Sequence, residues 1–188
     1  MVRTATPGDV PALRTTLARA FDDDPVSCFS LPDARRRPAQ LERFFGERLK
    51  TLLDDELVFC DEDHRGAALW AAPDRWRVSL GEVLRYRTVT RRSPLFLLGA
   101  YLVEKRHPEE PHFYLASLGV DPSAQGQGLG TRLMAPMLER CDREGVPAFL
   151  ESSKERNVAF YERHGFRVTE EAKMPRGPTL WLMWRTPR

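Results

Sequence analysis

Three glycines, each separated from the next by one residue, lie at the junction of a predicted strand and a predicted helix in the second half of this chain. Residues 113–120 form an apolar run typical of a strand, and apolar side chains recur at helical spacing over residues 128–144. The segment that joins them reads Gln-Gly-Gln-Gly-Leu-Gly-Thr, from Gln125 to Thr131. Backbone amides at a helix N-terminus attract anions, and glycine lets a phosphate approach without a Cβ in the way. The loop therefore predicts a diphosphate site in an α/β fold, with an ordinary glycine-rich turn as the alternative.

The rest of the chain carries further helical and strand patterns, which favours one α/β domain over residues 1–188. Predicted strands cover residues 2–5, 57–60, 67–70, 113–120, 148–150, 166–169 and 180–184. Predicted helices start at Thr6 and cover residues 38–53, 79–106, 128–144 and 157–164, with a break at Ser93-Pro94. A stretch rich in aspartate and proline, residues 22–25, is predicted to be a loop.

Composition and charge exclude several classes of protein. The 29 basic and 27 acidic residues are spread along the chain and give a net charge of +2, so nucleic acid is not an expected partner. The longest apolar stretch, residues 95–103, is far below the roughly 20 residues of a membrane-spanning helix. The first residues lack the apolar core of a secretory signal, so we expect a cytoplasmic protein. Three widely separated cysteines show no metal-binding or redox spacing, so no metal is expected.

Two segments resemble the signatures of one enzyme family. Read from Gln125, the glycine loop has the pattern Gln-x-x-Gly-x-Gly, whose spacing matches neither a Rossmann fingerprint nor a Walker A loop. This pattern resembles the CoA-binding motif of the GNAT acetyltransferases. Asn157 and the residues Phe-Tyr-Glu-Arg-His-Gly-Phe at 160–166 are similar to the second signature of that family. The resemblance implies the GNAT fold, with a mixed central sheet of about six to seven strands flanked by helices on both faces.

A closer similarity is to the puromycin N-acetyltransferases, a group within that family. It extends over residues 113–120, the glycine loop, residues 147–153 and residues 160–166. The resemblance implies transfer of acetyl from acetyl-CoA to a primary amine of an antibiotic-like or amino-acid-like small molecule. Direct attack in a ternary complex is expected, because no cysteine lies in the signatures to carry an acyl group. A peptide or protein N-terminal acetyltransferase, or a CoA-binding regulatory module without turnover, are the alternatives, and the protein is expected to be a monomer or a homodimer.

The resemblance also implies where acetyl-CoA binds. The main chain at residues 118–120 would bond the pantetheine arm as though it were an added strand, and one of these amides would polarise the thioester carbonyl. The amide of Asn157 would serve pantetheine, or else cap the short helix that follows it. The predicted cofactor-binding residues are Leu118, Gly119, Val120, Gln125, Gly126, Gln127, Gly128, Leu129, Gly130, Thr131 and Asn157.

Acyl transfer to an amine needs an acid for the departing thiolate and a base for the amine. Tyr161 occupies the position that the resemblance implies for the acid, and its alternative role is an aromatic packed in the core. Glu151, just after a predicted strand, is the first candidate for the base, and the alternative is an exposed carboxylate at a strand end. Glu110 and His112 precede the motif strand and are expected in a solvated loop. His164 is expected to contact the last carbonyls of the short helix.

The acceptor pocket of this fold is expected between the first two helices and the sheet. That position makes Phe21, Asp24 and Trp70 the candidate acceptor-binding residues. The acidic run at residues 22–24 would attract an ammonium group, or it forms a solvated loop between helices. Trp70 would be a wall of the pocket or a residue of the core.

Overall fold

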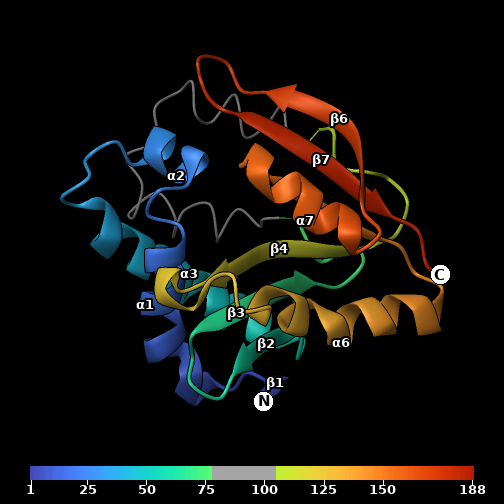
Figure 1. Cartoon of the computed structure of the whole chain (residues 1–188), viewed down its shortest axis with the longest axis horizontal. Coiled ribbons are helices and arrows are strands. Elements are labelled where there is room, and N and C mark those ends of the chain that lie inside the picture. Colours follow the sequence, from blue (N-terminus) through green and yellow to red (C-terminus); the bar gives the residue numbers. More distant parts are fainter. Residues whose placement is uncertain (78–104) are drawn as a thin grey trace.

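Within residues 1–77 and 105–188, which the computed structural model describes, seven strands form one mixed sheet (Figure 1). In spatial order the strands are β1 (Val2–Thr4), β2 (Val58–Asp61), β3 (Gly66–Ala71), β4 (Phe113–Val120), β5 (Ala148–Ser152), β7 (Thr179–Arg185) and β6 (Arg167–Lys173). Every neighbouring pair is antiparallel except β4 and β5, which are parallel. The predicted α/β architecture and the mixed sheet are confirmed.

Helices cover both faces of this sheet (Figure 1). The first half contributes a 3-10 turn η1 (Pro7–Asp9), α1 (Val10–Ala20), α2 (Pro25–Ser30) and α3 (Arg37–Leu53). The second half contributes η2 (Pro122–Ala124), α6 (Leu129–Glu144), η3 (Glu155–Asn157) and α7 (Val158–Arg163). The helical segment predicted at 79–106 lies outside the described residues, apart from residues 105 and 106, which form a turn. None of the helices described is long and apolar enough to cross a membrane.

Strand alternation sorts the side chains of β3 into two cores. Ala67 and Leu69 pack with α1 and α3, whereas Ala68 and Trp70 pack with α6 on the opposite face. The helices supply matching apolar stripes, so that for example Leu17 of α1 is fully buried against the sheet. The sheet therefore separates two apolar cores, one on each of its faces.

Two elements differ from their predicted extents. Helix α2 occupies part of a stretch that was predicted to be a loop: Asp24 is its N-cap and accepts hydrogen bonds from the backbone amides of Val26 and Ser27 at 3.0 and 3.1 Å. Strand β6 continues to Lys173, well beyond the predicted end at residue 169. Most of its residues are exposed because it is an edge strand, so it lacks the apolar pattern by which strands are recognised.

Candidate active site

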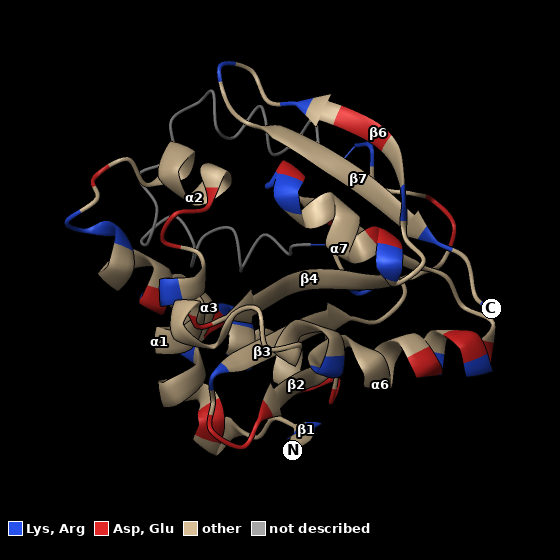
Figure 2. Ribbon diagram, in the orientation of Figure 1, with Lys and Arg blue, Asp and Glu red and all other residues tan. Residues whose placement is uncertain are grey.

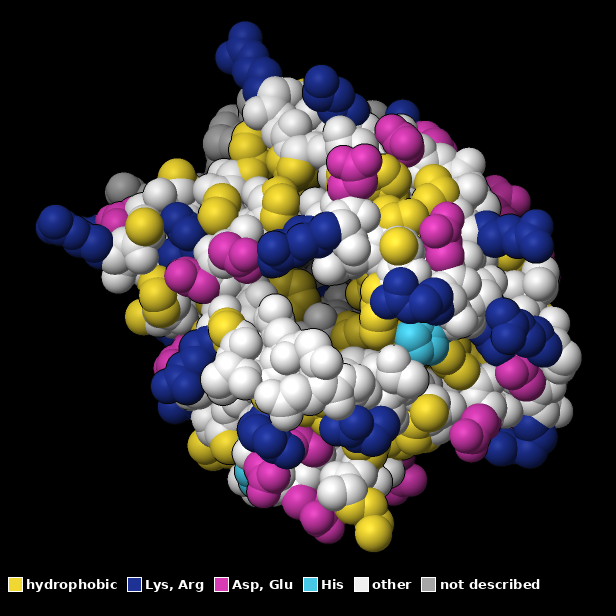
Figure 3. Space-filling model, in the orientation of Figure 1, with side chains coloured by type: hydrophobic (Ala, Val, Ile, Leu, Met, Phe, Trp, Pro, Cys, Tyr) yellow, Lys and Arg dark blue, Asp and Glu magenta, His cyan; other side chains and the backbone are white. Residues whose placement is uncertain are grey.

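A pocket of about 500 Å³ opens between the end of α1, strands β4 and β5, the glycine loop and α7. Figure 3 shows the surface hollowed near the middle of the face in view, with basic side chains around the hollow. Of the predicted site residues, those that line the pocket are Phe21, Asp24, Leu118, Gly119, Val120, Gln125, Gly126, Gly128, Leu129, Gly130, Thr131, Glu151, Asn157 and Tyr161. Residues far apart in the sequence thus meet at one cavity.

The pocket exists because β4 and β5 pair over only three of the eight residues of β4. Their register joins residues 113–115 of β4 to residues 148–150 of β5 and ends there. On the other edge of β4 the pairing with β3 shifts by one residue, so that Leu69 faces Ser117 but Trp70 faces Leu115. A bulge of this kind bends a strand, and here it accompanies the divergence of β4 from β5. Backbone groups of residues 116–120 that point away from β3 are left facing the pocket.

The glycine loop has the conformation that an anion site requires. Gly126 and Gly128 have φ of +75° and +73°, in the left-handed region that favours glycine, and Gly128 is the N-cap of α6. The first helical hydrogen bond runs from the amide of Arg132 to the carbonyl of Gly128, so the amides of residues 129–131 have no acceptor within the helix. No atom lies within 4 Å of a Cβ added at Gly126. Free amides, the helix dipole and open space fit the diphosphate of CoA.

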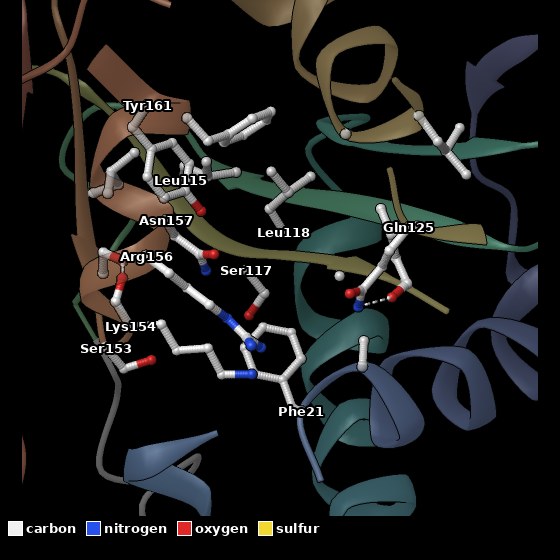
Figure 4. Close-up of a pocket in the computed structure, with 18 of the residues that line it drawn as sticks. Phe21, Leu115, Ser117, Leu118, Gln125, Ser153, Lys154, Arg156, Asn157 and Tyr161 are labelled. Atoms are coloured by element: carbon white, nitrogen blue, oxygen red, sulfur yellow. Dashed lines mark hydrogen bonds between the residues drawn. The ribbon is translucent and has the colours of Figure 1, made fainter. Parts of the chain in front are cut away.

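Two amide side chains border the channel between this loop and α7 (Figure 4). Gln125 donates a hydrogen bond to the carbonyl of Val120 at 3.1 Å, which ties the loop to the end of β4. Asn157 is the N-cap of α7 by position, but its side chain makes no capping hydrogen bond and lines the pocket instead. Asn157 thus has the N-cap position of the alternative interpretation without a capping hydrogen bond, and its amide is available to the amide groups of pantetheine.

Tyr161 projects from α7 into the pocket (Figure 4). It is 8% exposed and packs with the α6 core, so the predicted core packing of its ring is compatible with a place on the pocket wall. Burial raises the pKa of the Tyr161 phenol, and the charge of Asp24 raises this pKa further. The hydroxyl is therefore protonated throughout the neutral range and can donate a proton or a hydrogen bond.

Glu151 reaches the same pocket from the other face of the sheet. Phe149 and Glu151 alternate along β5 with Leu150, which packs into the α6 core. One oxygen of Glu151 accepts a hydrogen bond from the hydroxyl of Tyr114 at 3.1 Å. Burial raises the pKa of Tyr114, and the charge of Glu151 adds to the effect, so Tyr114 remains a donor. Glu151 is therefore a held carboxylate and not the freely exposed one of the alternative interpretation.

The acidic run at residues 22–24 ties the first helices to the loop after β5. Asp23 forms ion pairs with Lys154 and with Arg156, and the hydrogen bond from Lys154 is the main cause that lowers the pKa of Asp23. Asp24, 5% exposed, accepts a hydrogen bond from the hydroxyl of Ser153. We call the segments 21–24 and 153–156 together the rim. The run is thus a turn between α1 and α2 in which Asp24 is buried, whereas the side chain of Asp23 stays 67% exposed.

Three residues of the rim were missed by sequence reasoning. Ser153, Lys154 and Arg156 all line the pocket, and the two basic side chains extend toward Phe21 (Figure 4). Their partners lie about 130 residues earlier in the chain, so no local pattern marks them. Acidic and basic positions are interspersed over many of the helices and loops described (Figure 2), which gives single charges little predictive value.

Two of the predicted site residues do not line this pocket. Trp70 is fully buried, because its position in β3 directs it into the α6 core, away from the α1 side where Phe21 lies. The interpretation of Trp70 as a pocket wall is therefore corrected to that of a core residue. The side chain of Gln127 is exposed and donates to the carbonyl of Ser123 at 3.3 Å.

The two histidines considered in the sequence have different outcomes. His164 faces the carbonyl of Phe160 through Nδ1 at 2.8 Å, as predicted for the end of the short helix. His112 is 1% exposed, so its predicted place in a solvated loop is wrong. It is held by the carbonyl of Glu110 and by a second histidine, His107, two contacts that the sequence pattern does not reveal.

Gly119 is where α1 approaches β4 most closely. A Cβ built there lies 2.6 Å from Cδ2 of Leu17 and 3.2 Å from Cβ of Ala20. We expect Gly119→Ala to lower the free energy of unfolding by about 1–3 kcal/mol through overpacking, measured by urea denaturation. Gly8→Ala is the matched control, because the nearest atom to its added Cβ is 3.7 Å away. Equal stability of the two variants would contradict the close approach.

Comparison with known proteins connects this geometry to a family. The model of the acetyltransferase (GNAT) family matches residues 41–166, which is more than half of the chain. A relative from Schizosaccharomyces pombe, named as an uncharacterized N-acetyltransferase, is 28% identical over 176 residues, which cover 84% of this chain and 70% of the relative.

Solved structures share the fold along the entire chain. A structure from Corynebacterium glutamicum, described as histone acetyltransferase HPA2 and related acetyltransferase, has a TM-score of 0.75 at 24% identity, covering 100% of this chain and 96% of its own. Arylalkylamine N-acetyltransferase 2 from Aedes aegypti has a TM-score of 0.67 at 16% identity, with 100% and 99% covered. Because the family model spans most of the second half and part of the first, the chain belongs to the GNAT acetyltransferase family, and it is an acetyl-CoA-dependent N-acetyltransferase.

Proposed function

We propose that this enzyme transfers acetyl from acetyl-CoA to the primary amine of a small molecule, with Glu151 as the base and Tyr161 as the acid. The observation that carries the proposal is that the two side chains line one pocket from opposite faces of the sheet, at the gap between β4 and β5. An acyl group held in that gap has an acid on one side and a base on the other. The amine therefore approaches from the Glu151 side.

Residues of β4 and the glycine loop hold the acetyl donor in this scheme. The free amides of residues 129–131 bind the diphosphate, and the unpaired backbone of residues 116–120 bonds the pantetheine arm. One amide of this stretch polarises the thioester carbonyl as charge develops on its oxygen. Asn157 adds an amide side chain that no protein group within the described residues engages.

Protons enter and leave by different groups. Glu151 removes a proton from the acceptor ammonium, which otherwise has no lone pair for attack. The hydroxyl of Tyr161 donates to the departing sulfur, and its raised pKa returns it readily to the neutral form. Among the described residues no cysteine lines the pocket, which favours direct transfer over an acyl-enzyme.

The rim favours a small acceptor. Ion pairs and a hydrogen bond join segments 21–24 and 153–156 across the pocket, which leaves less room for an extended peptide than an open groove would. Phe21 and Asp24 at this rim offer one aromatic face and one carboxylate to an amine. The name of the Aedes aegypti neighbour, an arylalkylamine N-acetyltransferase, agrees with an acceptor of this kind.

Thiol release from acetyl-CoA by the purified protein tests the proposal. The panel of amines contains puromycin, arylalkylamines, polyamines, amino acids, aminoglycosides and short peptides. Release with a small amine, and none with peptides, is the expected result. Release with peptides alone would favour an N-terminal acetyltransferase, and thermal stabilisation by acetyl-CoA without turnover would favour a regulatory CoA-binding module.

Glu151→Gln is expected to lower kcat/KM about 10²- to 10³-fold at neutral pH, because the amide cannot take the proton of the amine. The loss of activity on the acidic side of the pH profile should disappear with the carboxylate, since a base works only when it is deprotonated. Glu139→Gln, at an exposed carboxylate of α6 that does not line the pocket, is the matched control and should keep wild-type rates. An unchanged pH profile in Glu151→Gln would remove Glu151 from its role.

A further inference from the structure

Two buried histidines lie directly behind Glu151. His107 and His112 are 9% and 1% exposed, and neither lines the acceptor pocket. The ring of Trp76 stacks on His107 with a centroid distance of 3.4 Å, and Phe149 meets its edge at 4.6 Å. Burial of two titratable rings between aromatic side chains is costly unless their polar atoms are paired.

A chain of hydrogen bonds fixes where the protons of these rings reside. The carbonyl of Glu110 lies 2.6 Å from Nδ1 of His112, and a carbonyl can only accept, so Nδ1 carries a hydrogen. Burial lowers the pKa of His112, which keeps the ring neutral and leaves a lone pair on its Nε2. That atom lies 2.8 Å from Nε2 of His107, which must therefore be the donor.

The tautomer of His107 follows from this chain. With hydrogen on Nε2, a neutral His107 has its lone pair on Nδ1, and Nδ1 lies 3.8 Å from Oε1 of Glu151. This distance is longer than a hydrogen bond, and a small side-chain rotation or one water closes it. The other oxygen of Glu151 accepts from Tyr114, whose hydroxyl is already protonated. Among the described residues, Nδ1 of His107 is thus a proton acceptor that Glu151 faces.

We propose that His107 relays the proton of the acceptor amine, taking it at Nδ1 from Glu151. The N–H bond of the ammonium breaks as an O–H bond forms on Glu151; that O–H bond then breaks as Nδ1–H forms, leaving the carboxylate and an imidazolium. The proton leaves to solvent after the product. His107 acts through Glu151 and does not touch the acceptor, and the inference rests on the proposed role of Glu151 as base.

The surroundings favour the charged relay. The face of Trp76 stabilises an imidazolium by a cation–π interaction, and the restored carboxylate of Glu151 attracts it. The charges of Asp74 and Glu110 raise the pKa of the neighbouring His112, so they also favour positive charge in this pair of rings. Arg48 is the opposing cation, and its charge acts on Tyr114. Of these four charged groups in the described part of the chain, Glu151, Asp74 and Glu110 are negative and Arg48 is positive.

His107→Gln tests the relay, because the side-chain amide can still donate toward His112 but cannot accept a proton. We expect kcat/KM to fall about 10²-fold and the acidic limb of the pH profile to move, because the imidazole no longer takes part in the proton transfer. A histidine with a merely structural role would lower the rate without moving the limb. His64→Gln, at the partly exposed histidine paired with Asp9, is the matched control and should leave both kcat/KM and the acidic limb unchanged. An unmoved limb in His107→Gln overturns the relay.

Nitrogen-15 NMR of the imidazole rings gives a second readout that needs no amine substrate. At mildly alkaline pH we expect hydrogen on Nδ1 of His112 and on Nε2 of His107, with the titration of His107 altered in Glu151→Gln. Hydrogen on Nδ1 of a neutral His107 would overturn the inference. If no amine releases thiol, the proposed function fails, whereas these spectra still decide whether Nδ1 can accept a proton from Glu151.

Discussion

Tyr161→Phe is expected to lower kcat about 10²- to 10³-fold while the affinity for acetyl-CoA stays close to that of the wild type. The substitution removes only the phenolic hydroxyl, and that hydroxyl makes no hydrogen bond to a protein group in the described part of the chain. The departing thiolate then leaves without a proton donor, a loss typical of general acid catalysis. The ring still packs in the α6 core, so stability should change little.

The pH dependence of the wild type gives a second check on Tyr161. An acid works only while it is protonated, so activity is lost as pH rises through its pKa. Burial and the charge of Asp24 raise that pKa above its ordinary value of 10.0, so the alkaline limb should lie above that value. Steady-state rates across pH locate the alkaline limb. Thermal shifts with acetyl-CoA measure whether Tyr161→Phe keeps its affinity for the donor. Wild-type turnover in Tyr161→Phe would show that water or another group protonates the thiolate.

The proposed acid and the proposed base can serve one reaction because the sheet is open between them. A continuous sheet would separate Tyr161, on the α6 side, from Glu151, on the other side. The one-residue shift in β4 and the short pairing with β5 remove that barrier. In the proposed mechanism the reacting carbonyl therefore has its proton donor on one face and its proton acceptor on the other, so that no proton passes directly between Tyr161 and Glu151.

Local patterns predicted the fold of the segment that is proposed to bind the donor. The alternation of β4, the glycine loop and the apolar stripe of α6 all arise within about thirty consecutive residues, and each follows from backbone geometry. Helix α2 was missed although Asp24-Pro25, an N-cap followed by proline at the first helical position, is a helix start signal. Its six residues are too few for periodicity to show.

Nonlocal packing decided what the sequence did not. Whether Trp70 faces the pocket or the core depends on which face of β3 the α6 helix covers, and that is a property of the assembled sheet. The pairing of His107 with His112 depends on the burial of their loop. The contacts of Asp23 with Lys154 and Arg156 join segments more than a hundred residues apart. These relations have no periodic signal in the chain.

Gly128→Glu is expected to abolish acetyl-CoA binding, so that neither thiol release nor thermal stabilisation by acetyl-CoA is detectable. Gly128 is the N-cap of α6 with φ of +73°, and the amides that follow it point to the predicted diphosphate site. A glutamate there places a side chain and a negative charge where the diphosphate would lie. It also forces a left-handed conformation on a residue with a Cβ, which costs about 1–2 kcal/mol.

Gly145→Glu separates the loss of binding from that backbone strain. Gly145 ends the same helix with φ of +67°, a Cβ there meets no atom within 4 Å, and it does not line the pocket. The two variants therefore share the cost of a left-handed glutamate but differ in their distance from the site. We expect both to lose similar stability in urea denaturation, and only Gly128→Glu to lose the thermal shift with acetyl-CoA. Equal retention of binding in both variants would place the diphosphate away from the glycine loop, whereas equal loss would trace the effect to a weakened α6 helix.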